Sequence, residues 1–139
     1  LYLDPDNKGK HSLLPTPGNA TVIVRTVPLQ LALEGTSVHR IDLIKMDIEG
    51  WEGKAFRGMQ EIIERDHPEL FFEFAPVRIA KTGEDPVQLL STLVDQGYEL
   101  FEINEKQDVE LPVTHIEHFT ERFVGFDDYA DVHARKRSA

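Results

Sequence analysis

The sequence predicts an α/β fold with a mostly parallel β-sheet, and two observations predict it. Residues 41–52 (IDLIKMDIEGWE) are a near-continuous apolar run that ends in carboxylates. Such a run, bounded by a turn signal, is typical of a strand buried on both faces of a parallel sheet. Strand-like and helix-period segments then alternate up to residue 105, at a spacing that leaves room for βαβ crossovers.

The elements before this strand are short. Residues 1–14 (LYLDPDNKGKHSLL) predict a hairpin, because turn formers separate two strand-like ends. Residues 21–27 (TVIVRTV) are rich in β-branched side chains and predict a strand. Pro28 favours a first helical turn, so residues 29–33 predict a short helix that stops at Gly35.

After the strand predicted over residues 41–48, one amphipathic helix is expected, followed by regular alternation that weakens beyond residue 104. The expected elements are, in order, a helix over 52–66, a strand over 70–74, a helix over 85–96, a strand over 98–103, a short strand over 109–113, a weak helix or loop over 115–123, and a last strand over 123–126.

Composition indicates a globular protein with one domain over residues 1–139. The chain is 40% hydrophobic and 29% charged. Its formal net charge of -10 argues against a nucleic-acid partner, because such affinity depends largely on Lys and Arg. The basic cluster Arg135-Lys136-Arg137 is expected to be a solvated tail.

The chain has no cysteine, which excludes disulfides, zinc-thiolate sites and thiol nucleophiles and is compatible with a reducing compartment. No apolar run approaches the ~20 residues of a membrane span, and no signal peptide is visible. We therefore expect a cytoplasmic protein without a membrane partner. Because Leu1 lies inside an expected strand, we also expect a fragment of a longer chain.

The carboxylates at the end of the 41–48 strand are the first candidates for chemistry. Asp47 and Glu49 lie two residues apart, and ligands of open α/β sheets bind outside the carboxyl ends of strands. These side chains could accept hydrogen bonds from a ligand, hold a cation, or act as a general base. Alternatively, one of them caps the following helix, where negative charge is favourable.

Glu73 closes the next expected strand between two phenylalanines. A carboxylate there is costly to bury alone, so it either reaches the strand-end crevice or pairs with Lys45 or Arg78. Lys45 is itself a charge inside an apolar strand and is expected to pair with a carboxylate. Trp51 could stack on a ligand beside the crevice, although ordinary packing is the more typical role of such a residue.

Other catalytic patterns are weak or missing. His115, Glu117 and His118 form a loose HxEH, which without a third ligand is more typical of solvated histidines than of a metal site. The chain contains no GxGxxG and no P-loop to wrap a nucleotide phosphate. No Ser-His or Cys-His pairing indicates nucleophilic catalysis.

The stretch IDLIKMDIEGWEGKAFRG resembles the signature of the FkbM-type S-adenosylmethionine-dependent methyltransferases. The matching residues are Asp42, Lys45, Asp47, Glu49, Gly50, Glu52 and Gly58. The segments LYLDPDNKGKHSLL, TVIVRTVPLQLAL, HPELFFEF and GYELFEIN resemble the elements around that signature, so the similarity covers residues 1–105 well and residues 106–139 loosely.

The resemblance implies a Rossmann-like methyltransferase sheet, mostly parallel and with helices on both faces. The glycine-containing first strand and the acidic ribose-binding residue of that family are missing here. The chain therefore resembles the C-terminal half of the catalytic domain, with roughly the fourth to seventh strands and an apparent truncation at the N-terminus. The implied cofactor is S-adenosylmethionine, whose main binding motif is not in this chain, and a metal requirement stays open.

The resemblance also implies methylation of a hydroxyl on a small molecule or sugar. Such a reaction needs an aligned acceptor oxygen and a base to remove its proton. By resemblance, Asp47 is the first candidate base and Glu49 the first candidate for orienting the acceptor. The expected vicinity of substrate and cofactor comprises Lys45, Gly50, Trp51, Glu52 and Glu73.

Two other interpretations stay open. In the first, the chain is a non-catalytic α/β module that self-associates or binds a protein partner, because missing strands would leave a sheet edge and an apolar face unprotected. In the second, weaker one, Asp47, Glu49 and His115 bind a metal.

Overall fold

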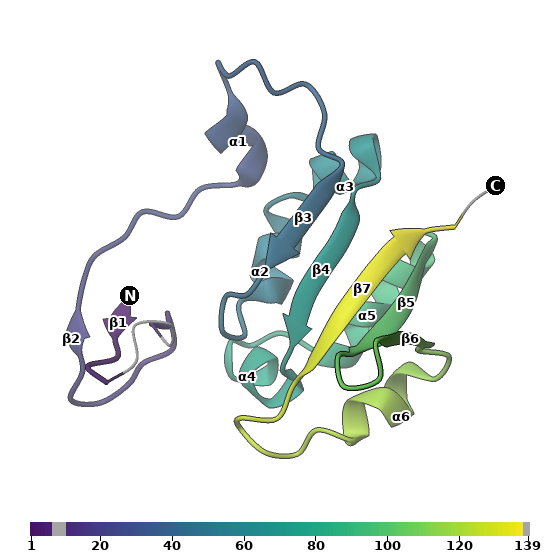
Figure 1. The fold of residues 1–139 in the computed structure, drawn as a ribbon. Coiled ribbons are helices and arrows are strands. Elements are labelled where there is room, and N and C mark those ends of the chain that lie inside the picture. Colours follow the sequence, from purple (N-terminus) through teal and green to yellow (C-terminus); the bar gives the residue numbers. More distant parts are fainter. Residues whose placement is uncertain (7–10, 138–139) are drawn as a thin grey trace.

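A five-stranded sheet forms the centre of the molecule, in the strand order β3–β4–β7–β5–β6 (Figure 1). The computed structural model describes residues 1–6 and 11–137. The strands are β3 (Leu43–Met46), β4 (Glu69–Phe74), β5 (Tyr98–Asn104), β6 (Val109–Pro112) and β7 (Ala130–Lys136).

The mostly parallel sheet predicted from the sequence is wrong. Only β3 and β4 pair in parallel, with Ile44 opposite Leu70, whereas the other three neighbouring pairs are antiparallel. The reason is the position of β7, which lies between β4 and β5 and runs against both. The fold is therefore a mixed α/β fold whose five-stranded sheet is mostly antiparallel.

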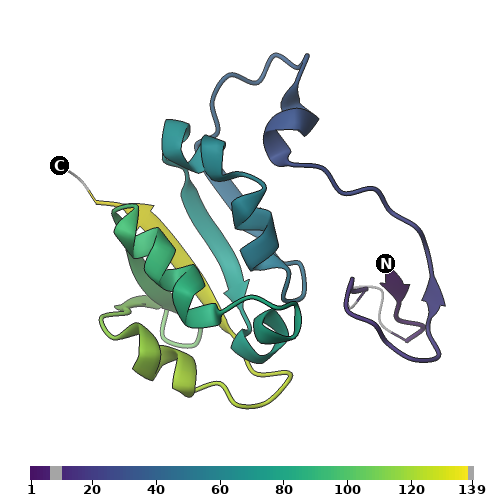
Figure 2. The same cartoon turned by 180° about the vertical axis from the view of Figure 1, so that it is seen from behind.

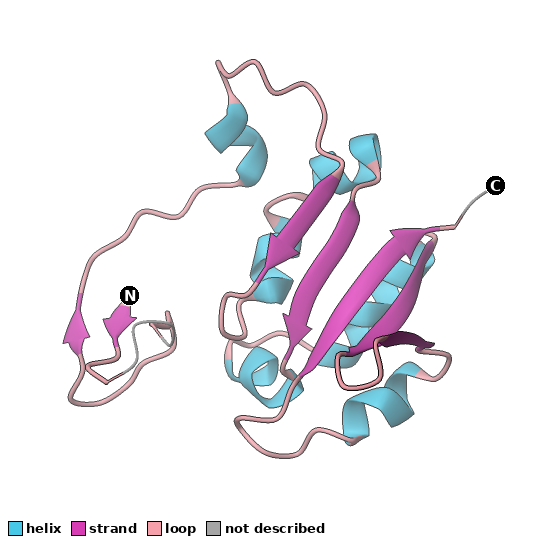
Figure 3. Ribbon diagram, in the orientation of Figure 1, coloured by secondary structure: helices cyan, strands magenta, loops and turns pink. Residues whose placement is uncertain are grey.

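Helices cover one face of this sheet. Figure 2 shows α2 (Glu52–Arg57), α3 (Gln60–Asp66) and α5 (Pro86–Asp95) in front of the strands when the molecule is seen from behind. The prediction of helices on both faces is wrong, because within the described residues the opposite face carries none of them (Figure 3).

Burial along the strands follows from this arrangement. In β4, Leu70, Phe72 and Phe74 are buried toward the helices, while Phe71 and Glu73 point to the open face and are half-buried. β3 likewise alternates between exposed and buried residues, so the expectation that it is buried on both faces is also wrong. The core packs these strand residues against helix residues, for example Phe56 edge-on to Phe72 at 5.1 Å between ring centroids.

The helix predicted over residues 52–66 is two helices. α2 ends at Arg57 and α3 begins at Gln60, with Gly58 and Met59 between them. The Gly58 carbonyl accepts a hydrogen bond from the backbone N–H of Leu29, 2.9 Å away, in the short helix α1 (Leu29–Leu33). A chain segment distant in sequence therefore uses the backbone at the break, which periodicity alone could not indicate.

Other element predictions are confirmed. α1 follows Pro28 as expected, and α5 begins after the N-cap Asp85, whose side chain accepts from the backbone N–H of Val87 and Gln88. β4, β5 and β6 match the predicted strands within about two residues. The weak helix expected over 115–123 is α6 (Ile116–Glu121), which lies beside α5.

The N-terminal segment only partly follows the prediction. Tyr2 and Ser12 exchange two backbone hydrogen bonds, of 2.7 and 3.1 Å, as a hairpin requires, while part of the expected turn lies outside the described residues. β1 (Tyr2–Leu3) also pairs with β2 (Ala20–Thr21). The strand expected over 21–27 stops at Thr21. Val22 still exchanges two hydrogen bonds with Leu1, of 2.8 and 2.7 Å, but no described edge pairs with residues 23–27. The apolar side chains of residues 22–27 are exposed.

Two elements were not predicted, and two predictions are wrong. α4 (Pro76–Lys81) is absent from the predicted elements, and the last strand is β7 rather than residues 123–126. β7 also contains Arg135 and Lys136, so these two side chains are not in a solvated tail. Arg135 lies over the ring of Phe101, 4.2 Å from its centroid, and Lys136 donates to the Gln96 carbonyl. Their apolar stems pack on the sheet while their charges reach polar partners.

None of the helices in the described part of the chain is both long enough and apolar enough to cross a membrane.

We expect Tyr98→Phe to lower the free energy of unfolding by about 1–3 kcal/mol, because a buried carbonyl loses its partner. The fully buried Tyr98 hydroxyl donates to the Pro68 carbonyl at 3.0 Å, and burial raises the pKa of Tyr98 to about 12. Urea denaturation measures the loss. Tyr129→Phe, which removes a hydroxyl from a half-exposed residue, is the control, and an equal loss in both variants would contradict the assignment.

Candidate active site at the carboxyl ends of β3 and β4

The carboxyl ends of β3 and β4 lie side by side because these two strands are parallel. The loop from Asp47 to Trp51 leaves β3 there, and α4 begins directly after β4. A cavity of about 610 Å³ lies at this edge. It is lined by Glu49, Glu73, Arg78, Lys81, Phe126, Asp127 and Tyr129, and by Asp4, Ser12, Leu14, Pro15 and Thr16 of the N-terminal segment.

Arg78 is the central group of this site. Its side chain is 8% exposed, and one guanidinium nitrogen donates to Glu49 while another lies 2.8 Å from Glu73 Oε1 as a close ion pair. The buried Nε of Arg78 has no hydrogen-bond partner in the described structure. Of the two partners expected for Glu73, the structure therefore selects Arg78. Lys45 pairs instead with Asp47, at 3.8 Å and largely exposed.

The β3–α2 loop turns sharply to bring Glu49 to Arg78. Glu49 and Gly50 both have left-handed backbone conformations, with φ of 58° and 95°. A Cβ on Gly50 would lie 2.7 Å from the Cβ of Arg78, so only glycine allows α4 to approach this closely. Trp51 is the N-cap of α2 and makes no side-chain capping bond, so neither Asp47 nor Glu49 caps this helix.

Asp47 and Glu49 end in different surroundings. β3 stops at Met46, so the alternation that would have placed both side chains on one side does not continue. The Asp47 side chain is 53% exposed beside Lys45, whereas that of Glu49 is 20% exposed and held by Arg78. Of the predicted site residues, Glu49 and Glu73 line the cavity.

Glu52 is a buried carboxyl behind the loop. Its side chain accepts from the Ile48 N–H at 3.1 Å through Oε1, and its Oε2 has no partner in the described structure. Burial raises the pKa of Glu52, and hydrogen bonds from the backbone of this loop together with the charge of Arg78 oppose that shift. Glu52 thus ties the loop to α2 from the inside, where a charge is disfavoured.

Glu73 is a carboxyl of the cavity whose pKa is raised. Burial is the main cause that raises the pKa of Glu73; the charge of Arg78 opposes the shift, and the charges of Asp47, Glu49 and Glu52 add to it. Three neighbouring carboxyls therefore raise the pKa of Glu73, and one arginine lowers it. A carboxyl with a raised pKa in a cavity is suited to exchange protons with a ligand.

Several residues that line the cavity are not among the predicted site residues, and Arg78 is predicted only as a partner of Glu73. Arg78 and Lys81 belong to the unpredicted α4, whose one sequence signal is Pro76 at its first turn. Phe126 and Tyr129 belong to the segment after α6, where a strand was expected instead. Lys81 Nζ lies 4.4 Å from the centroid of Phe126, and Arg78 Cζ lies 5.9 Å from that of Tyr129.

Trp51 does not line the cavity. Its buried indole Nε1 has no hydrogen-bond partner in the described structure, and Lys54 Nζ lies 5.4 Å from the centroid of its ring.

Metal binding has little geometric basis. Over residues 1–6 and 11–137, no group of three or more His, Asp or Glu side chains is arranged to hold a metal ion, and this includes Asp47, Glu49 and His115.

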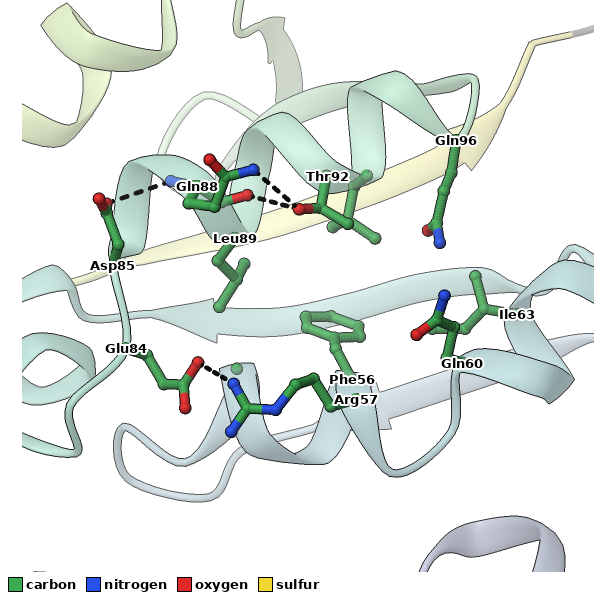
Figure 4. A pocket seen from close by; sticks show the side chains of 12 residues that line it. Phe56, Arg57, Gln60, Ile63, Glu84, Asp85, Gln88, Leu89, Thr92 and Gln96 are labelled. Atoms are coloured by element: carbon green, nitrogen blue, oxygen red, sulfur yellow. Dashed lines mark hydrogen bonds and ion pairs between the residues drawn. The ribbon is translucent and has the colours of Figure 1, made fainter.

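A second, smaller cavity of about 220 Å³ lies between α2–α3 and α5 (Figure 4). Phe56, Ile63 and Leu89 give it an apolar floor, and Arg57 pairs with Glu84 at its rim. None of the predicted site residues lines it. This groove lies on the helical face of the sheet, and we do not place the functional site there.

Fold and site together define an α/β protein with a carboxylate-rich cavity at the ends of two parallel strands. A family model described as Methyltransferase FkbM domain matches residues 1–100. The chain therefore belongs to the FkbM methyltransferase family, a family that implies S-adenosylmethionine as the methyl donor. The comparison with curated proteins gave no match, and the comparison with solved structures gave none either.

We expect Gly50→Ala to destabilise the protein more than Gly83→Ala. Both glycines have positive φ, of 95° and 86°, but a Cβ at residue 83 would meet nothing within 4 Å. Alanine in a positive-φ conformation costs about 1–3 kcal/mol of backbone strain at either position. Only Gly50→Ala adds a steric clash with Arg78 to this cost. Urea denaturation of both variants separates the two costs. Equal losses would contradict the close packing of the loop on α4.

We expect Glu52→Gln to change how stability depends on pH. The raised pKa means that the folded chain holds this proton more tightly than the unfolded chain, whose ordinary value is near 4.5. Below pH 4.5 the Glu52 carboxyl is protonated in both the folded and the unfolded wild type, so no charge is buried. As pH rises from there through the folded pKa, the wild type loses stability, because burial disfavours the ionised carboxylate. The stability of Glu52→Gln relative to wild type should rise with pH over that window.

Denaturation midpoints from pH 4.5 to 8 measure this difference. The glutamine oxygen still accepts from the Ile48 N–H, so the loop keeps its bond. Glu61→Gln, on the exposed side of α3, should show a flat difference. A flat difference for Glu52→Gln as well would refute the buried, proton-holding role.

Proposed function

We propose that this chain is part of an S-adenosylmethionine-dependent methyltransferase that methylates a hydroxyl on a small molecule or sugar. The observation that carries the proposal is the cavity in which Arg78 holds Glu49 and Glu73 at the ends of β3 and β4. Family membership supports the methyltransferase class. The acceptor and the O-methylation are our proposal.

We also propose that the sheet is the C-terminal half of a Rossmann-like methyltransferase sheet. β4 and β5 both run against β7, so β3, β4 and β5 share one direction. Their carboxyl ends consequently lie at one edge of the sheet, which is where ligands of open α/β sheets bind. This common direction supports the proposal although only one neighbouring pair is parallel.

The residues present fit one end of the implied cofactor. The methionine end of S-adenosylmethionine carries two cationic groups, the sulfonium and the α-amino group, and one α-carboxylate. A cavity wall with Glu49 and Glu73 suits the two cations, and Arg78 and Lys81 in the same wall suit the carboxylate. No glycine-rich turn that could hold the adenosine end occurs in this sequence. We therefore place only the methionine end at this site.

The reaction requires a base next to the acceptor hydroxyl. When bound, the cofactor supplies an electrophilic methyl group. As the acceptor oxygen gains a bond to carbon it must lose its proton, and a positioned carboxylate takes that proton. Asp47 is our first candidate for this base, and Glu73, which faces the cavity with a raised pKa, is the second. Glu49, held by Arg78, orients the acceptor.

We expect removal of the base to lower the methylation rate by about 10²–10⁴-fold. The assay follows methyl transfer from labelled S-adenosylmethionine to a panel of hydroxylated small molecules, for Asp47→Asn and Glu73→Gln. If Glu73 is the base, it must be ionised to act. Activity will then fall with decreasing pH at a higher pH than an ordinary glutamate would give. Glu99→Gln, an exposed change on β5, should leave the rate unchanged.

Cofactor binding is the first test. Calorimetry measures S-adenosylmethionine binding to this chain and to the same chain extended by any residues that precede Leu1 in its gene. Binding by either form supports the proposal. Binding by neither would refute it. An intact rate in Asp47→Asn would remove Asp47 as the base, and the same result in Glu73→Gln would remove Glu73.

One observation favours a second function, a non-catalytic module that acts by self-association or protein contact. Residues 22–27 expose apolar side chains, among them the fully exposed Ile23, and the outer edge of β3 has no neighbouring strand in the described structure. Unpaired edges and exposed apolar segments attract other chains. A stable dimer in light scattering, without cofactor binding, would favour this function.

A further inference from the structure

We propose that the loop Val124–Tyr129, between α6 and β7, is the acceptor-binding wall of the site, and that Phe126 and Tyr129 bind a neutral, hydroxylated ring of the sugar class. This inference rests on the proposed function, since it concerns the same cavity. The loop lies outside residues 1–100, so the family match does not supply it.

The loop has a defined shape. Asp128 Oδ2 accepts from the backbone N–H groups of Val124 and Gly125, at 3.2 and 2.7 Å, and the Asp128 N–H donates to the Gly125 carbonyl at 3.2 Å. A Cβ on Gly125 would lie 3.0 Å from the Asp128 carboxylate, so glycine allows the tight turn. The turn holds Phe126 and Asp127 at its tip, where both line the cavity.

Each aromatic ring of the loop is held by a cation of α4. Lys81 Nζ lies 4.4 Å from the ring centroid of Phe126, and Arg78 Cζ lies 5.9 Å from that of Tyr129. Cations within about 6 Å of an aromatic ring are attracted to its face. Yet Phe126 is 45% exposed and Tyr129 is 50% exposed, and both border the cavity. Two anchored rings therefore present apolar surface to whatever occupies it.

The polar groups around these rings select the ligand. Glu49, Glu73 and Asp127 line the same cavity and can accept hydrogen bonds from hydroxyl groups. A sugar ring offers both chemistries, because its C–H face packs on an aromatic ring while its hydroxyls donate to carboxylates. Ligand sites of this kind combine apolar contact with a few placed polar groups.

The same groups disfavour an anionic ligand. Arg78 already pairs with Glu49 and Glu73, and Lys81 lies over Phe126. The carboxylates on the wall outnumber these two cations once Asp127 is included. An acceptor that carries a phosphate would therefore meet repulsion in the cavity, whereas a neutral polyol would not.

The test is an NMR titration of the protein with neutral methyl hexopyranosides of the gluco, galacto, manno and rhamno series, with glucose 6-phosphate as the anionic comparison. We expect at least one neutral glycoside to shift the backbone amides of residues 124–129. Phe126→Leu and Tyr129→Leu should each weaken that binding about fivefold, since each removes one stacking ring. Glucose 6-phosphate should bind more weakly than the neutral glycosides.

The matched control is Phe101→Leu. Phe101 also has a guanidinium over its ring, that of Arg135 at 4.2 Å, but it lies on the open face of the sheet and does not line the cavity. This variant should bind glycosides like the wild type. Shifts outside the loop only, unchanged binding in both loop variants, tighter binding of glucose 6-phosphate, or no binding of any glycoside would each overturn the proposal.

These outcomes separate the inference from the proposed function. The titration with glycosides needs no cofactor, so the amide shifts of the loop report glycoside binding independently of S-adenosylmethionine. If the loop binds a glycoside but the protein does not bind S-adenosylmethionine, the methyltransferase proposal is refuted. The role of the loop Val124–Tyr129 in binding a sugar ring is then supported. Binding of S-adenosylmethionine without binding of any glycoside would support the methyltransferase proposal and refute the role of the loop.

Discussion

The rest of the site depends on the buried guanidinium of Arg78. Withdrawing an arginine from water is costly unless an opposite charge pairs with it. Glu49 and Glu73 supply the charges, from the β3–α2 loop and from β4, and Tyr129 lies beside the guanidinium from the loop before β7. One side chain of α4 therefore fixes the relative positions of three separate segments.

This constraint explains several local features that would otherwise be unfavourable. Glu49 adopts a left-handed backbone conformation, and Gly50 has no room for a side chain because the backbone of α4 passes at contact distance. Glu52 is buried without a full set of partners behind the same loop. Each feature costs stability on its own. Together they hold carboxyls close to one cation, and that excess of negative charge helps to raise the pKa of Glu73.

The hydrophobic core and the candidate site lie on different parts of the sheet. Its helical face contains the core, where Leu70, Phe72 and Phe74 pack, whereas its carboxyl-end edge holds the polar groups. The opposite face has a mixed character: His133 stacks on Phe71 and contacts Glu69 and Glu110. A stable core can thus exist beside the site, because the core packs on the helical face of the sheet while the polar groups gather at its carboxyl-end edge.

The sequence by itself determined the elements whose signals are local. Pro28 began α1, Asp85 capped α5, and the apolar run of residues 41–48 contained β3, with acidic residues following its carboxyl end. The family signature was also readable, because it is continuous. Only the tertiary structure decided that β7 inserts between β4 and β5, that Arg78 meets a glutamate 29 residues away, and that Phe126 and Tyr129 reach the cavity. The physical reason is that strand pairing and buried ion pairs join residues distant along the chain, and no local pattern of side chains specifies which distant partner will be met.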